Sequence, residues 1–180
     1  IMEHFDKVCF DEITIGKQKK ASEIDLIDIG RNMKEKLDEI PEIKELDWVV
    51  IENQISPIAN RMKTIQGMLA QYFIMNNPKS DISFISSSNK LKQFSFHKIE
   101  KREPNNDNDD ITNKNYKENK KNGVYYSLKL LEQNEQLTMW IETLNTKKKD
   151  DLADSLLQGI WALRQKNIIL CADDLKIKLV

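Results

Sequence analysis

A glutamate directly follows a run of four apolar residues at 48–51 (WVVI). Such a continuous run predicts a β-strand that is covered on both faces, as in a parallel sheet. Glu52 would then lie at the carboxyl end of a buried strand, which is where open α/β sheets bind their ligands. The alternative interpretation is an exposed glutamate that ends the strand and has no chemical role.

Two further carboxylates lie three residues apart in the segment 150–154 (DDLAD). In a helix this spacing places Asp151 and Asp154 on one face, where like charges repel by about 0.2–0.5 kcal/mol and a divalent cation between them would reverse the sign. The alternative is capping, because acidic residues in a first turn interact favourably with the helix dipole. The three lysines at 147–149 oppose that dipole, however, and a phosphate backbone beside an acidic metal site would explain both charges.

Cations in two other segments could contact phosphates. The segment 114–121 is rich in lysine, and Arg61 and Lys63 begin the helix expected after Glu52. Each group is open to a second interpretation as solvated surface charge. The functional interpretation assigns these residues to phosphate contacts, with one lysine near the scissile bond.

Hydrolysis of a phosphodiester suits these residue types. Three or four carboxylates can hold two Mg²⁺ ions about 4 Å apart, one to activate water and one to stabilise the leaving oxygen. Mg²⁺ prefers oxygen ligands, so the site needs no His or Cys. His4 and His97 lack ligand spacing, the five glycines are isolated, and the serines at 86–88 have no nucleophile-elbow context. Zinc, P-loop and serine-nucleophile enzymes are therefore not expected.

The elements that must position these residues alternate between strand and helix. Apolar spacing predicts a helix over 29–37 with Asp28 as N-cap, and a second helix opened by Ser56 and Pro57. The apolar stripe of that second helix consists of Ile58, Met62, Ile65, Leu69 and Phe73. A strand is expected over 81–86. A last long helix is expected from Asp150 to about Lys166, with Leu152, Leu156, Ile160 and Leu163 on its apolar face.

Length and composition predict one α/β domain over 1–180. The 180 residues carry 28 Lys+Arg and 29 Asp+Glu, a net charge of −1. No apolar run reaches the roughly 20 residues that cross a bilayer, and two cysteines exclude a disulfide scaffold. The expected location is a reducing, intracellular one. Residues 96–122 are so polar that we interpret them as a mobile insertion outside the core.

Three strings together resemble one protein family. They are 50–54 (VIENQ), 61–66 (RMKTIQ) and 148–155 (KKDDLADS), in a strand-then-helix context. The resemblance is to the Holliday junction resolvases of poxviruses, iridoviruses and giant viruses, with their fungal mitochondrial relatives. These belong to the RuvC-type branch of the RNase H-like superfamily. The similarity extends from about Ile24 to Leu163.

This resemblance implies a homodimeric endodeoxyribonuclease that uses Mg²⁺, with Mn²⁺ as substitute, to make paired nicks in four-way DNA junctions. Its mixed sheet would be flanked by helices, and a two-fold dimer would match the symmetry of the branched DNA. The implied metal ligands are Glu52, Asp151 and Asp154. Lys117, Lys120 or Lys121 lies where the family carries basic residues ahead of a helix, and we take Lys121 as the catalytic lysine. The implied DNA contacts are Arg61, Lys63, Lys117, Lys120, Lys148 and Lys149. A viral origin would place the protein in a virus factory in the host cytoplasm or in the nucleus.

The sequence departs from the family in its first strand. That strand carries an aspartate in an Asp-x-Gly setting, and here the string occurs only at 28–30, directly before a helix. We therefore expect a chain that lacks the first strand, holds three of four carboxylates and is feebly active or inactive. The alternatives are a non-catalytic DNA-binding or assembly module of the same fold, a related nuclease with another substrate, and an unrelated helical scaffold.

Overall fold

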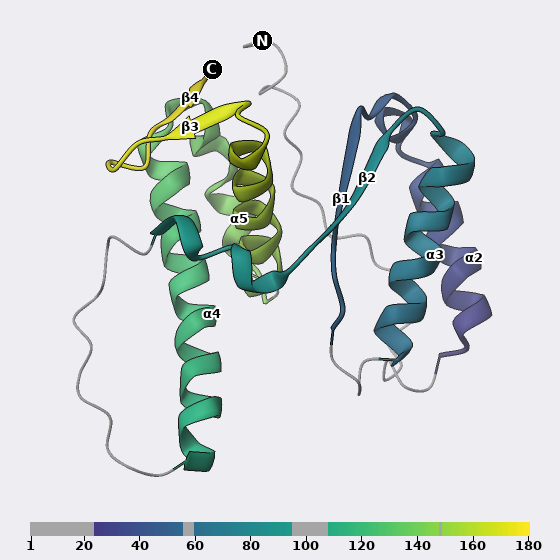
Figure 1. Cartoon of the computed structure of the whole chain (residues 1–180), viewed down its shortest axis with the longest axis horizontal. Coiled ribbons are helices and arrows are strands. Elements are labelled where there is room, and N and C mark those ends of the chain that lie inside the picture. The colour runs from purple at the N-terminus through teal and green to yellow at the C-terminus, as the bar shows by residue number, and fades with distance from the viewer. Residues whose placement is uncertain (1–23, 56–59, 95–107, 148) are drawn as a thin grey trace. The chain divides into compact units, whose positions relative to one another are not determined.

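The computed structural model describes residues 24–55, 60–94, 108–147 and 149–180 (Figure 1). Contacts divide them into two compact units, an N-terminal unit that ends at Ser87 and a C-terminal unit that begins at Ser88. Each unit combines helices with a small sheet and has its own core, which confirms a mixed α/β chain. The single domain over 1–180 stays a prediction, and the two units are described separately.

The N-terminal unit consists of two helices and two parallel strands, connected by a 3₁₀ helix. Its elements are α2 (Leu26–Asp38), η2 (Pro41–Glu45), β1 (Trp48–Glu52), α3 (Asn60–Asn76) and β2 (Asp81–Ile85). The strands pair in parallel from Trp48 opposite Asp81 to Glu52 opposite Ile85, as the apolar run predicts. Figure 1 shows α2 and α3 side by side next to this pair.

Burial along β1 is less complete than the sequence predicts. Val49 and Ile51 are buried, whereas Trp48, Val50 and Glu52 alternate with them as half-buried residues. Alternation of this kind is typical of a strand with one well-covered face. The expectation of a strand covered on both faces is therefore fully met on one face of β1 and only partly on the other.

The two helices of this unit begin differently from expectation. Asp25, and not Asp28, caps α2, because its side chain accepts a hydrogen bond from the backbone N–H of Ile27 at 2.7 Å. The predicted core face of α2 is confirmed, with Ile29, Met33 and Leu37 buried. The Ser56–Pro57 start expected for the next helix lies outside the described residues.

The predicted apolar stripe of α3 is confirmed only in its second half. Phe73 is buried and Leu69 packs against the core, but Met62 is exposed. The helix therefore contacts the core mainly through its carboxyl-terminal turns. Three-residue and four-residue spacing identifies a helix face, but it does not say how far along the helix the partner element extends.

The C-terminal unit is built on two long helices and a small antiparallel sheet. The helices are α4 (Asn108–Gln133) and α5 (Lys149–Gln165), and the strands are β3 (Ile169–Cys171) and β4 (Ile177–Leu179). Short 3₁₀ helices lie before and between the helices: η3 (Ser87–Asn89), η4 (Lys92–Phe94), η5 (Glu135–Trp140) and η6 (Glu142–Leu144). The predicted face of α5 is confirmed, since Leu156 and Ile160 are buried and Leu152 and Leu163 pack against the same core.

The structure describes only the second part of the polar segment 96–122. Residues 95–107 lie outside the described part of the chain, as do the apolar pieces near the amino terminus at 8–15. From Asn108 onward the segment is helix α4, and the interpretation of 108–122 as an insertion outside the core stays a prediction. Lys and Glu are good helix formers, and the helix is anchored because its apolar second half packs on α5. No helix among the described residues is long and apolar enough to span a membrane.

Candidate functional site

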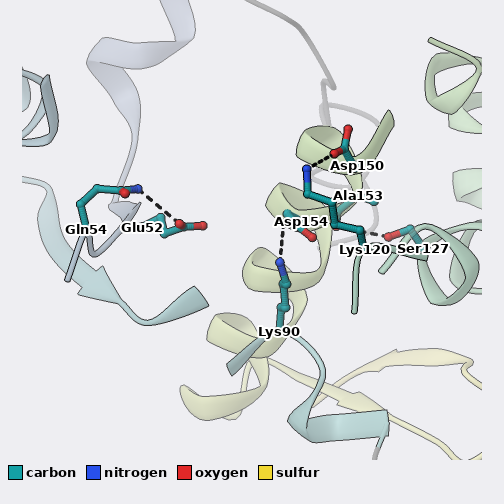
Figure 2. A network of polar contacts seen from close by, with 8 residues as sticks. All are labelled: Glu52, Gln54, Lys90, Lys120, Ser127, Asp150, Ala153 and Asp154. Atoms are coloured by element: carbon teal, nitrogen blue, oxygen red, sulfur yellow. Dashed lines mark hydrogen bonds and ion pairs between the residues drawn. The ribbon is translucent and has the colours of Figure 1, made fainter. Parts of the chain in front are cut away.

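Glu52 is the last residue of β1 and is half-buried. The side-chain amide of Gln54 donates a hydrogen bond to Glu52 Oε1 at 3.2 Å (Figure 2). The backbone N–H of Gln54 donates to Gln66 Oε1 on α3 at 2.8 Å, and the backbone N–H of Asn53 donates to the carbonyl of Ile85 at 2.7 Å. The chain after β1 is thus held to both β2 and α3, which fixes the Glu52 carboxylate at the carboxyl end of a parallel pair.

Asp154 lies on α5 and forms an ion pair with Lys90 (Figure 2). Both side chains are largely buried, with 21% of Asp154 and 14% of Lys90 exposed. Lys90 comes from the turn that follows η3, which itself follows β2. On the other side of the carboxylate lies Gly123 of α4, where a Cβ atom would come within 3.2 Å of Asp154 Oδ1. The missing side chain of Gly123 therefore provides the space in which this carboxylate lies.

A buried hydroxyl holds α4 against α5 beside Asp154. Ser127 is fully buried, and its Oγ donates to the backbone carbonyl of Ala153 at 3.2 Å. Ala153 is itself fully buried. This contact lets the two helices approach closely and fixes the position of the residue directly before Asp154.

The other aspartates of this segment have different surroundings. Asp151 is exposed whereas Asp154 is largely buried, although both lie on α5 at the three-residue spacing that places them on one face. Asp150, which the sequence argument did not assign, forms an ion pair of 2.5 Å with Lys120. The hydrogen bond from Lys120 lowers the pKa of the Asp150 carboxyl below its ordinary value.

The predicted cations also separate into groups. Lys121 on α4, Lys149 on α5 and Lys63 on α3 are exposed. Arg61 is not a free surface cation, because its guanidinium donates to the backbone carbonyl of Ile24. Lys120 is paired with Asp150, Lys117 lies on α4 with a side chain that is not described, and Lys148 lies outside the described residues.

The carboxylates have the chemistry that Mg²⁺ needs, because all of their donor atoms are oxygens. Glu52 belongs to the N-terminal unit, and Asp151 and Asp154 belong to the C-terminal unit. Among the residues that the structure describes, no group of three or more His, Cys, Asp and Glu side chains could hold a metal ion. The described residues of the N-terminal unit thus supply one of the three predicted ligands, and those of the C-terminal unit supply the other two.

Lys90 is the residue that sequence reasoning missed. A signal was present in the sequence, because Lys90 follows shortly after β2, and the segments after the carboxyl ends of parallel strands commonly carry ligand-binding residues. The polar composition of 86–90 concealed it, since Ser and Asn residues are typical of an ordinary loop.

Comparison with known proteins gives one informative similarity. The chain is 31% identical over 143 residues to "Uncharacterized protein L451" of Acanthamoeba polyphaga mimivirus. The aligned region is 73% of this chain but 33% of that protein, so the chain spans about a third of the length of the relative it matches. No family model matches the chain, and no solved structure is significantly similar to it.

Proposed function

We propose that this chain is part of a Mg²⁺-dependent endonuclease of the RNase H-like fold, which resolves four-way DNA junctions by paired nicks. The observation that carries the proposal is the position of Glu52, at the carboxyl end of a parallel strand pair with its side chain held by Gln54. Ligands of α/β sheets bind at this edge. The resemblance of 50–54 to the viral resolvases assigns the same glutamate to metal binding.

The second carboxylate, Asp154, supports the same function through its surroundings. It is largely buried, beside a glycine that leaves room for it, on a helix that Ser127 fixes in place. A buried carboxylate needs a cation, and Lys90 supplies one here. In the proposed enzyme Glu52, Asp151 and Asp154 would hold Mg²⁺, which would supply Lewis-acid chemistry.

The exposed lysines have the role of binding the DNA backbone. Lys121 and Lys149 are exposed on the two helices that also carry Lys120 and Asp154. Their charge favours phosphate contacts, which would weaken as the salt concentration rises. We propose Lys121 as the lysine nearest the scissile phosphate, and a homodimer as the assembly that matches a two-fold junction. The mimivirus relative is consistent with a viral origin.

Cleavage of synthetic DNA tests the proposal. The protein expressed from its own gene is incubated with a labelled mobile four-way junction and Mg²⁺, with linear duplex and RNA–DNA hybrid as competitors. We expect paired nicks in the junction, and a loss of rate of about 100-fold or more in Glu52→Gln and in Asp154→Asn, because a lost ligand costs at least as much as a lost outer-shell partner.

The controls replace exposed acids of the same two units. Glu42→Gln and Asp173→Asn should cut at the parental rate, because both side chains are exposed and neither is an assigned ligand. If Glu52→Gln and Asp154→Asn also cut at the parental rate, the proposal is wrong. Preferential cleavage of the hybrid would instead indicate a related nuclease with another substrate.

The second candidate is a non-catalytic DNA-binding or assembly module of the same fold. The observation in its favour is that lysines neutralise two of the acids on α5, Asp150 and Asp154. Such a module would bind the junction tightly in a gel-shift assay and would leave it intact at every Mg²⁺ concentration.

A further inference from the structure

Lys90 and Asp154 form a largely buried ion pair, with 14% and 21% of the two side chains exposed. For comparison, the pair of Lys120 and Asp150 leaves 37% and 27% of the two side chains exposed. Two charges that are largely removed from water depend strongly on each other, because the loss of either partner leaves the other uncompensated. The pair therefore persists only while no other cation takes over the charge of Asp154.

The surroundings of Asp154 leave little freedom for a second cation. Oδ2 contacts the Lys90 ammonium, and Oδ1 lies where a side chain at Gly123 would be. A divalent cation at Oδ2 would have to take the place of the ammonium, because two cations in contact with one oxygen repel each other strongly at low effective dielectric constant. Movement of the carboxylate away from Lys90 is restricted, since α4 lies against its other oxygen.

We infer that Lys90 is a built-in counter-ion of Asp154, which a divalent cation must displace in order to bind. This inference rests on the proposed function, because it takes Asp154 as a metal ligand. Lys90 is then a positioning residue: it holds the carboxylate charged and oriented in the absence of metal, and it weakens metal binding by competing for the same oxygen.

Titration with metal alone tests the competition. Mg²⁺ binding is measured by calorimetry, and Mn²⁺ binding by the spin-resonance signal of the free ion, on the whole protein without DNA. We expect Lys90→Gln to bind either ion at least about fivefold more tightly than the parent. Lys90→Arg, which keeps the charge, should bind within about twofold of the parent.

The matched control separates direct competition from a general effect of charge. Lys129→Gln removes a lysine from the exposed pair with Glu132 on α4, and it should change the metal affinity by less than about twofold, because Glu132 is not an assigned ligand. An equal gain in Lys90→Gln and Lys129→Gln would overturn the inference. So would a loss of stability in Lys90→Gln with unchanged metal affinity, which indicates a purely structural lysine.

A measurement on the unmodified protein keeps the test valid even if Lys90→Gln does not fold. An ammonium held in a buried ion pair exchanges its protons slowly enough to give a lysine side-chain NMR signal, which Lys90→Arg identifies by its loss. Mg²⁺ should shift or abolish this signal in the parent protein. A Lys90 signal that stays constant while Mg²⁺ saturates the parent contradicts displacement.

The result of the metal-binding tests can be distinguished from the result of the junction-cleavage test of the proposed function. Junction cleavage with no effect of Lys90→Gln on metal affinity would leave the nuclease standing and overturn the counter-ion. Displacement of Lys90 by metal without any cleavage would support the counter-ion and contradict the nuclease.

Discussion

The two units differ in how completely their cores are closed. In the C-terminal unit Leu130, Leu131 and Leu157 have no exposed surface, whereas Val49 and Ile51 of the N-terminal unit each keep 7%. The C-terminal core lies between two long helices and a β-hairpin, while the N-terminal core lies between two helices and a two-stranded sheet. Helix–helix packing thus encloses its apolar side chains more fully than this small sheet does.

The same contrast applies to the two carboxylates of the proposed site. Asp154 lies on a helix anchored in the closed core and is balanced by the charged Lys90. Glu52 lies at the end of a strand in the more open unit and has the neutral amide of Gln54 beside it. A neutral hydrogen bond is weaker than a charge-assisted one, so the two carboxylates differ in the free energy needed to exchange their partners for a metal ion.

The largest effect is expected from truncating the closed core. Leu157→Ala should lower the free energy of unfolding by about 4 kcal/mol, because the cavity is surrounded by packed atoms on all sides. Ile51→Ala should cost about 2.5 kcal/mol, because its site is less enclosed and can relax. Urea unfolding followed by circular dichroism measures both, and equal losses would show that the two cores are equally tight.

The next effect concerns the glycine beside Asp154. Gly159→Ala on α5 has no atom within 4 Å of the new Cβ and should raise the stability by about 0.5–1 kcal/mol, as for Gly→Ala in a helix. Gly123→Ala meets Asp154 Oδ1 at 3.2 Å, and Lys90 prevents the carboxylate from turning away. We therefore expect a loss of about 1 kcal/mol instead of a gain.

A double-mutant cycle sharpens this prediction. Combined with Lys90→Gln, Gly123→Ala should cost less than in the parent, since the carboxylate has then lost its ion pair with Lys90. Thermal unfolding of the four proteins measures the coupling. Additive losses would mean that α4, and not Lys90, fixes the position of Asp154.

Much of the local structure could be predicted from the sequence. The run at 48–51 predicted β1 and its parallel partner, and spacing predicted the buried faces of α2 and α5. These features depend on the period of the apolar residues, which a single segment already contains. The spacing did not show which end of α3 packs against the core. Met62, in the first turns of the helix, is exposed, contrary to expectation.

The parts that could not be predicted depend on contacts between distant segments. The pair of Lys90 and Asp154 joins residues 64 positions apart, and no local pattern contains it. Helix formation over 108–122 likewise follows from the anchoring of α4 on α5, while its polar composition alone indicated a loop. The identity of the carboxylates was predictable from residue type, but the cations that balance them depend on the tertiary fold.

A smaller effect should appear at high pH in the N-terminal unit. Burial, together with a hydrogen bond of 2.8 Å to Asp38, raises the pKa of Tyr72 to about 12. Because the folded-state pKa is above the unfolded value of about 10, this stabilisation is complete below pH 10 and is lost as the pH rises toward 12. Tyr72→Phe should lose about 1 kcal/mol at neutral pH and show a flatter stability curve between pH 10 and 12. Urea unfolding of the parent and of Tyr72→Phe between pH 10 and 12 measures the difference in stability. Parallel curves of stability against pH would contradict the raised pKa of Tyr72.

The smallest effect is expected at the more exposed pair of the C-terminal unit. The hydrogen bond from Lys120 lowers the pKa of Asp150, so its stabilisation is present above the unfolded value of about 4 and is lost as the pH falls through the folded-state pKa. Lys120→Gln should therefore cost no more than about 0.5 kcal/mol at pH 7, because water screens this pair, and the cost should vanish in acid. Lys90→Gln should cost more at pH 7, since its partner is more deeply buried. Equal costs for the two variants would mean that burial does not distinguish the two ion pairs, and that Lys90 does not differ in energy from an ordinary surface counter-ion.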